Sequence, residues 1–209
     1  MNLLVVAATK FEIAPFLKEN PNADVLITGV GIPATIFHLT KKLSENKYDL
    51  AIQAGIAGAF GNRLNLGDVV AVEKDTFGDL GIDEDGNFQT LFEKEFVGKN
   101  DFPFHDGWLI NHTSSFNNQG LPQAKGITVN LVTGDSTRNK WTEEKFSADI
   151  ESMEGAAFHY VCLQQEIDFL QLRSISNKVG ERDKTKWETA KAIKNLNEEL
   201  FKTINNLSI

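Results

Sequence analysis

Residues 50–59 read Leu-Ala-Ile-Gln-Ala-Gly-Ile-Ala-Gly-Ala. The first half, Leu50–Ala54, is apolar almost throughout and predicts a strand that is covered on both faces. The second half, Ala54–Ala59, consists of small residues and predicts a loop at the carboxyl end of that strand. Ligands of open α/β folds bind at this edge of the sheet. The segment therefore predicts a fold class and the place of a binding site.

Similar apolar runs recur along the chain, with helical patterns between them. The predicted strands are Leu3–Ala8, Val25–Thr28, Leu50–Ala54, Val69–Val72, Ile127–Val132 and Phe169–Ile175. The predicted helices are Glu12–Lys18, Pro33–Leu43, Glu154–Gln165 and Trp187–Leu207. Residues 74–115 follow neither pattern and are expected to be irregular. This order predicts an α/β fold in which helices flank a mostly parallel or mixed sheet.

The bulk properties restrict the class of protein. A length of 209 residues fits one domain, 1–209, and no linker divides it. The net charge of −8 argues against nucleic acid or an anionic membrane surface as the main partner. The N-terminal apolar run is short and lacks a basic region, so neither a signal peptide nor a membrane span is expected.

Cysteine, histidine and tryptophan usage adds three expectations. The single cysteine, Cys162, cannot form an intrachain disulfide, which favours a reducing compartment and a cytoplasmic protein. The four histidines lack metal-ligand spacing, so we expect no metal site. The tryptophans, Trp187 among them, are expected in the core or at a subunit contact.

Three further motifs could carry chemistry. Thr28-Gly29-Val30-Gly31 lies between a predicted strand and a helix, where free N–H groups could bind an anion or a hydroxyl group, or form only a tight turn. Glu151 to Ala157 begins a helix with a carboxylate, and Glu154 could bind a diol or merely complement the helix N-terminus. Leu172 to Asn177 ends a strand, and Asn177 could be a turn former.

Taken in order, these segments resemble the nucleoside phosphorylase and nucleosidase superfamily, in particular the branch of methylthioadenosine/S-adenosylhomocysteine nucleosidase. The most specific elements are Ser152-Met153-Glu154 and Arg173-Ser174-Ile175-Ser176. Leu66-Gly67-Asp68 and Thr133-Gly134-Asp135 stand between the glycine motifs and these elements. The resemblance implies a three-layer α/β fold with a central, mixed and twisted β-sheet flanked by helices.

The resemblance also implies roles for individual residues. Glu12 would be the general base that activates water, and Glu154 would hold the ribose hydroxyls. Met153 would pack against the ribose. Thr137 falls where those enzymes usually carry an aromatic side chain near the base, a departure that puts adenine in doubt. The residues expected to contact the substrate are Gly55, Ile56, Thr137, Met153, Ser176 and Arg182.

Asn177 is a second departure, because the methylthioadenosine-type enzymes carry an Asp there. A carboxylate only accepts hydrogen bonds, which suits the 6-amino group of adenine. An amide can donate to the oxygen of a 6-oxopurine while its carbonyl accepts from N7–H. Two facing acceptors would cost roughly 1–3 kcal/mol, so Asn177 favours hypoxanthine or guanine. The amide cannot supply the N7 proton, which must come from water unless the base leaves as an anion.

The arginines favour water over phosphate as the nucleophile. Phosphorylases clamp phosphate, usually with Arg. None of the four arginines of this chain falls inside the glycine segments 29–31 and 55–58; they are Arg63, Arg138, Arg173 and Arg182.

A hydrolase of this superfamily with a 6-oxopurine preference resembles futalosine hydrolase of the menaquinone pathway. Ile150–Cys162 and residues 177–183 are similar to that family. The resemblance implies release of hypoxanthine and dehypoxanthine futalosine without a cofactor, by a homo-oligomer (dimer or higher). The aromatic carboxylate at the 5′ end of the substrate could meet Arg138, Arg182 or Lys178.

Three alternatives remain open at this point. The chain could be a 6-oxopurine nucleoside phosphorylase, which phosphate-dependent product formation would reveal. It could be a methylthioadenosine-type nucleosidase, which Asn177 disfavours. It could also be a nucleoside-binding protein without catalysis, although pure binding does not require a water-activating base such as Glu12.

Overall fold

The structure is a computed structural model that describes residues 1–19, 22–113 and 120–207. Its strands are β1 (Leu3–Ala7), β2 (Asp24–Ile27), β3 (Leu50–Ala59), β4 (Val69–Phe77), β5 (Gly81–Glu84), β6 (Asn87–Thr90), β7 (Leu109–Ile110), β8 (Gln123–Thr128), β9 (Ile150–Ser152) and β10 (Asp168–Lys178). Its helices are α1 (Ala14–Lys18), α2 (Ile32–Glu45), α4 (Ser136–Phe146), α5 (Gly155–Gln164) and α6 (Thr189–Leu207), with a 3₁₀ turn η1 (Lys184–Lys186) before α6.

The main sheet has an open part and a part that closes on itself. In the open part, β1 lies between β2 and β3 and is parallel to both. In the other part, β3 pairs with β10, β10 with β4, β4 with β8 and β8 with β9. The short β9 then returns to pair antiparallel with the end of β3 at Gly58 and Ala59. The mixed sheet is thus curled, and β3, β10, β4, β8 and β9 form a closed ring.

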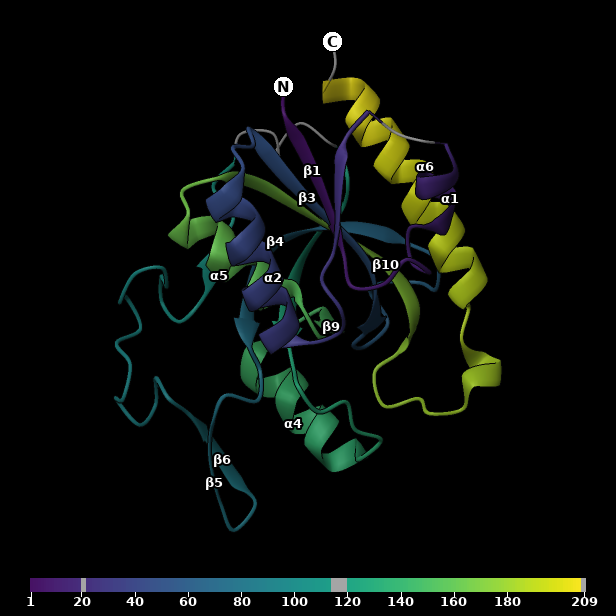
Figure 1. The fold of residues 1–209 in the computed structure, drawn as a ribbon. Coiled ribbons are helices and arrows are strands. Elements are labelled where there is room, and N and C mark those ends of the chain that lie inside the picture. Colours follow the sequence, from purple (N-terminus) through teal and green to yellow (C-terminus); the bar gives the residue numbers. More distant parts are fainter. Residues whose placement is uncertain (20–21, 114–119, 208–209) are drawn as a thin grey trace.

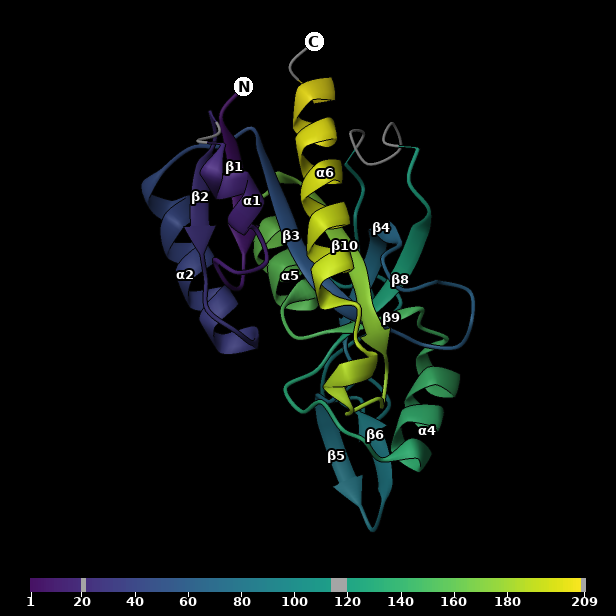
Figure 2. The same ribbon diagram turned by 90° about the vertical axis from the view of Figure 1, so that its right-hand side faces the viewer.

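Helices cover both faces of the open part, as Figures 1 and 2 show. On one face, Val5 of β1 and Ile52 of β3 belong to a core cluster with Leu196 and Leu200 of α6. On the other face, the alternate residues of β1 belong to a cluster with α2 and α5. Since successive strand side chains point to opposite faces, a run of apolar residues in β1 fills both cores. This confirms the predicted three-layer arrangement.

The predicted elements of the open part are confirmed with small shifts at their ends, and the main errors lie elsewhere. The predicted loop 54–59 is wrong, because β3 continues to Ala59. The predicted strand Ile127–Val132 is also wrong beyond Thr128, since β8 spans Gln123–Thr128 and the chain then leaves the sheet. Residues 74–115 contain the end of β4, the β5–β6 hairpin and β7.

Besides β5, β6 and β7, helix α4 and strand β9 were not predicted. Helix α4 buries only Thr142, so it lacks the apolar stripe by which a helix is recognised. Its one signal is Asp135, whose side chain accepts hydrogen bonds from the N–H groups of Thr137 and Arg138 and caps the helix. Strand β9 has three residues, too few to show a period.

No helix within the described part of the chain is both long enough and apolar enough to cross a membrane.

Candidate active site

A cavity of about 490 Å³ opens where β3, β9 and β10 end and α5 begins. Its wall contains seven of the residues that the sequence predicts for the site: Glu12, Ile56, Met153, Glu154, Ser176, Asn177 and Arg182. Two predicted residues, Gly55 and Thr137, are not in the wall. The structure thus brings together residues that lie up to 170 positions apart in the chain.

Glu12 is held at the cavity by backbone and hydroxyl donors. It follows β1 and is buried, with 7% of its surface exposed. Its Oε2 accepts hydrogen bonds from the N–H and the hydroxyl of Thr9 (3.0 and 2.9 Å), and its Oε1 accepts from the N–H of Ile56 (3.2 Å). The backbone carbonyl of Glu12 accepts from Asn197 of α6 (2.8 Å), which fixes the loop. Since each carboxylate oxygen can accept two bonds, Oε1 keeps one free position.

Glu154 approaches the same region from the N-terminus of α5. Its Oε1 accepts a hydrogen bond from the N–H of Gly31 (2.9 Å), and its Oε2 lies 3.7 Å from Nη1 of Arg173. Burial raises the pKa of Glu154, and the charge of Arg173 and the hydrogen bond from the Gly31 N–H oppose this rise. The bond to Gly31 shows that Glu154 ties the glycine turn before α2 to α5, so it does more than complement its own helix.

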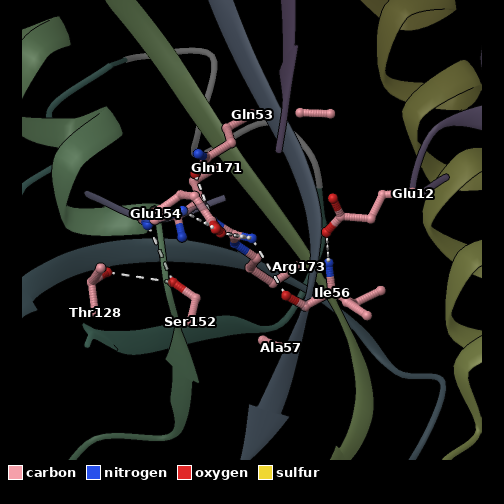
Figure 3. A network of polar contacts seen from close by, with 12 residues as sticks. Glu12, Gln53, Ile56, Ala57, Thr128, Ser152, Glu154, Gln171 and Arg173 are labelled. Carbon is pink, nitrogen blue, oxygen red and sulfur yellow. Dashed lines mark hydrogen bonds and ion pairs between the residues drawn. The ribbon is translucent and has the colours of Figure 1, made fainter. Parts of the chain in front are cut away.

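Arg173 lies between the two glutamates in the view of Figure 3 and is itself 1% exposed. Its Nη2 donates to Oε1 of Gln53 (2.8 Å), and its Nη1 donates to the carbonyl of Ile56 (3.4 Å). It is not part of the cavity wall. Because breaking a buried ion pair leaves an uncompensated charge, we assign Arg173 to the support of Glu154 rather than to a ligand.

Gly55 explains how this support fits beneath the cavity. A Cβ atom on Gly55 would lie 2.3 Å from Nη1 of Arg173 and 3.1 Å from Oε1 of Glu12. A glycine inside a strand often marks such a close approach. The sequence predicts substrate contact for Gly55, whereas the structure places two side chains of the site in the space that its side chain would take.

A second polar cluster lies under the start of α5. The hydroxyl of Thr128 donates to Oδ1 of Asp75 (2.9 Å) and accepts from the N–H of Ala156 (2.7 Å). Gln171 donates to the other oxygen of Asp75 (3.3 Å). Burial raises the pKa of Asp75 to about 7. A Cβ on Gly155 would lie 2.1 Å from Oδ2 of Asp75, which explains the small residue after Glu154.

His159 and Cys162 on α5 lie outside the cavity wall. Both are fully buried, and His159 Nδ1 lies 3.0 Å from the carbonyl of Leu109. Burial lowers the pKa of His159 to about 4 and raises that of the Cys162 thiol. Neither side chain is available for catalysis as a charged group. Within the described residues, no group of three or more His, Cys, Asp or Glu side chains is arranged to hold a metal ion.

Asn177 is the second-last residue of β10 and lies in the cavity wall. It directly follows an irregularity at Ser176 in the pairing of β10 with β3. Its Oδ1 accepts from the Ser176 hydroxyl (2.7 Å), and its Nδ2 donates to the carbonyl of Lys178 (2.9 Å). Both amide atoms keep further capacity, since the amide offers two donors and two acceptor positions. The amide is oriented by the strand end and is not simply a turn former.

The basic residues named for the 5′ end of the substrate are placed differently from one another. Lys178 donates to the carbonyls of Gly61 and Leu64 (2.6 and 2.9 Å) and is not in the cavity wall. Arg182 is in the wall, and its charge offsets part of the rise that burial causes in the pKa of the nearby Glu151. Thr137 is exposed on α4. Trp187, expected in the core or at a subunit contact, is part of the wall and donates to the carbonyl of Glu181 (3.0 Å).

Glu151 is a buried carboxylate of the cavity wall that the sequence analysis did not assign to the site. It is 9% exposed and lies on β9, three residues before Glu154. Burial raises its pKa to about 7, and the charge of Asp79 acts in the same direction. Arg138 and Arg182 oppose this shift. A carboxylate in a predicted buried strand would have been the available signal, but β9 is too short to be predicted.

Three comparisons place this chain among known proteins. The sequence model of the phosphorylase superfamily matches residues 6–205. A futalosine hydrolase of Thermus thermophilus is 32% identical over 91% of this chain and 89% of its own length. A 5′-methylthioadenosine/S-adenosylhomocysteine nucleosidase of Bacillus subtilis is 31% identical over 78% and 71%, respectively. Among solved structures, a futalosine hydrolase of Helicobacter pylori superposes with a TM-score of 0.81 at 15% identity, covering 99% of this chain and 98% of the other.

Proposed function

Because the chain belongs to the phosphorylase superfamily, we propose that it is a nucleosidase that hydrolyses the N-glycosidic bond of futalosine. The products are hypoxanthine and dehypoxanthine futalosine. A relative that matches over nine tenths of the chain is a futalosine hydrolase. One structural observation supports the assignment above the others: Glu12, Glu154 and the amide of Asn177 line one cavity.

The two glutamates fit the sugar half of the reaction. Cleavage passes through an oxocarbenium-like state, in which the sugar becomes cationic. Glu154 keeps acceptor positions for the vicinal hydroxyls of the ribose, and its charge lies near the developing cation. The free position on Oε1 of Glu12 accepts a proton from water as the water attacks the anomeric carbon. A positioned general base contributes about 10²–10⁴-fold to such a step.

Asn177 fits the base half. As the C–N bond breaks, its electron pair moves to the purine, which becomes anionic. The amide NH₂ of Asn177 donates to the 6-oxygen and thereby stabilises that charge. Its carbonyl accepts from N7–H once the base is protonated. An aspartate in this position would face the 6-oxygen with a second acceptor.

Water is favoured over phosphate by the charge of the wall. Glu12 and Glu154 place two carboxylates in the cavity wall, and carboxylates repel an anionic nucleophile such as phosphate. Arg173, the arginine nearest to them, is 1% exposed and occupied by Gln53 and Glu154. Since a bound phosphate requires paired basic groups, we assign hydrolysis rather than phosphorolysis.

The proposal extends to the assembly and the compartment. Phe11 and Val30 in the cavity wall and Phe37 on α2 are 65%, 57% and 63% exposed. Exposed apolar groups beside a cavity are suited to contact with a second subunit. We therefore assign a homo-oligomer, a dimer or higher, in which a neighbour closes the 5′ end of the cavity. With its single buried cysteine, the chain suits the cytoplasm.

The test offers the protein futalosine, inosine and methylthioadenosine, each with and without phosphate, and follows the free base by chromatography. We expect hypoxanthine from futalosine at a rate that phosphate does not change. Release that requires phosphate would identify a phosphorylase, and preferential release of adenine would identify a methylthioadenosine-type enzyme. No release from any substrate would favour a binding protein without catalysis.

A further inference from the structure

Glu151 and Asn177 lie in one row across the sheet. The register pairs Asn177 of β10 with Gly58 of β3, and pairs Gly58 in turn with Glu151 of β9. Residues directly opposite each other on neighbouring strands project to the same face. Both side chains therefore stand on the same face, on the two sides of a residue that has no side chain, and both line the cavity.

The gap above Gly58 has the width of a heterocyclic base with a partner at each edge. Neighbouring strands lie about 4.8 Å apart, so the Cα atoms of Asn177 and Glu151 are on the order of 10 Å apart. A hydrogen bond of about 2.9 Å at either edge leaves room for a flat ring system between them. A Cβ on Gly58 would lie 3.3 Å from Nδ2 of Asn177 and 3.1 Å from Val179, so a side chain would crowd this space.

Glu151 is buried without a hydrogen-bond donor from the described residues, although Glu12 and Glu154 each have one or more. The charged groups that face it come from three segments: Asp79 follows β4, Arg138 lies on α4 and Arg182 follows β10. Neither Arg138 nor Arg182 forms a hydrogen bond or an ion pair with the Glu151 carboxylate. The carboxylate oxygens of Glu151 are open to the cavity, so a ligand that brings a donor would replace water there.

The ring N–H groups of the purine bases decide which base can donate a hydrogen bond to Glu151. Hypoxanthine attached through N9 carries one ring N–H, at N1, and adenine attached in the same way carries none. We propose that Glu151 is the second side chain that binds the purine base, accepting the N1–H of a 6-oxopurine while Asn177 binds its O6 and N7 edge. The proposal deepens the assignment as a futalosine hydrolase and rests on it. Selection of the base is then shared by two residues on opposite sides of Gly58.

The test compares Glu151→Gln with a matched control, Glu144→Gln, which removes an exposed carboxylate of α4. We measure kcat/KM for futalosine and for its 6-amino analogue. Glu151→Gln replaces the charged acceptor by a neutral amide, which also offers a donor to N1 of the 6-amino analogue. It is expected to lower the ratio of kcat/KM for futalosine to that for the 6-amino analogue about 10- to 100-fold. The control should change neither. An unchanged ratio of the two substrates in Glu151→Gln would overturn the proposal.

The pH dependence gives a second criterion. Glu151 accepts N1–H more strongly when it is ionised, and burial raises its pKa to about 7 in the free protein. For wild type, kcat/KM for futalosine should rise as the pH increases from 6 to 8, and Glu151→Gln should lose this rise. If wild-type activity instead falls through pH 7 in a manner that Glu151→Gln abolishes, the protonated carboxyl is the active form and the N1 contact is wrong.

A change in the ligand tests the same contact without a variant. 1-Methylhypoxanthine lacks the N1 proton, so we expect it to inhibit wild type at least 10-fold more weakly than hypoxanthine does. Equal inhibition by the two bases would contradict the contact even if Glu151→Gln failed to fold. Wild-type turnover of futalosine, measured in the same series, tests the proposed function separately. Turnover with equal inhibition would reject only the role of Glu151.

Discussion

The proposed function gives the cavity a sugar end, with Glu12 and Glu154, and a base end, with Glu151 and Asn177. The carboxylates of the two ends differ in the hydrogen bonds that they accept from the protein. At the sugar end, Glu12 and Glu154 accept bonds from backbone N–H groups, and Arg173 stands behind them. At the base end, Glu151 has no donor within the described chain. Groups fixed before the substrate arrives need no reorganisation when charge develops, whereas a group left unpaired discriminates between ligands that can and cannot pair with it. Under the proposed function, this difference fits one end that drives bond cleavage and another that selects the base.

The largest effect is expected at the sugar end, from Glu12→Gln. The amide preserves the shape of the side chain but cannot take a proton from water. We expect kcat for futalosine to fall by about 10²–10⁴-fold with little change in KM. Single-turnover kinetics would measure the chemical step. A variant with wild-type kcat would show that the water is activated elsewhere and would remove the contrast between the two ends.

The next effect concerns the support beneath the sugar end. Arg173→Met leaves the buried carboxylate of Glu154 without its cation, which costs about 3–5 kcal/mol of stability. Arg63→Met is the matched control, since Arg63 is half exposed and its ion pair with Asp149 contributes about 0–1 kcal/mol. Urea unfolding of both variants gives the two values. Equal losses would mean that Arg173 does not hold Glu154 in place.

The smallest effect is expected at the base end, from Asn177→Asp. A second acceptor then faces the 6-oxygen, at a cost of roughly 1–3 kcal/mol, while the 6-amino group gains a partner. The ratio of kcat/KM for futalosine to that for its 6-amino analogue should therefore fall, with stability nearly unchanged. If the two substrates lose activity equally, residue 177 does not select the base.

The sequence predicts the open part of the sheet better than the curled part. β1 is apolar on both faces, so its composition alone indicates a buried strand. The return of β9 to β3 joins residues about 90 positions apart in the chain, and no local pattern encodes such a pairing. The predicted strand ends at Ala54, before the end of β3, because the glycines that follow suggest a loop. In the structure these glycines leave space for Arg173, Glu12 and Asn177.

The same limit applies to the site. Glu12, Glu154 and Asn177 could be assigned because they stand in motifs that resemble a known family. Glu151 stands beside one of those motifs, yet its position opposite Asn177 depends on the register of three strands. Gly55 and Thr137 were predicted from the same resemblance, but neither lies in the cavity wall, since a sequence motif alone does not determine which residues face a cavity.

The buried Asp75 and His159 beneath α5 have a consequence for how acidity acts on the fold. Folding raises the pKa of Asp75 from 3.8 to about 7, so its contribution to stability is full below pH 3.8 and is lost as the pH rises toward 7. Folding lowers the pKa of His159 from 6.5 to about 4, so its contribution is lost as the pH falls from 6.5 toward 4. Between pH 4 and 6.5 the stability contribution of Asp75 falls as the pH rises, whereas that of His159 increases. The two effects therefore oppose each other. Asp75→Asn would remove one slope, and its melting temperature, followed from pH 4 to 6.5, should then climb with pH more steeply than that of the wild type.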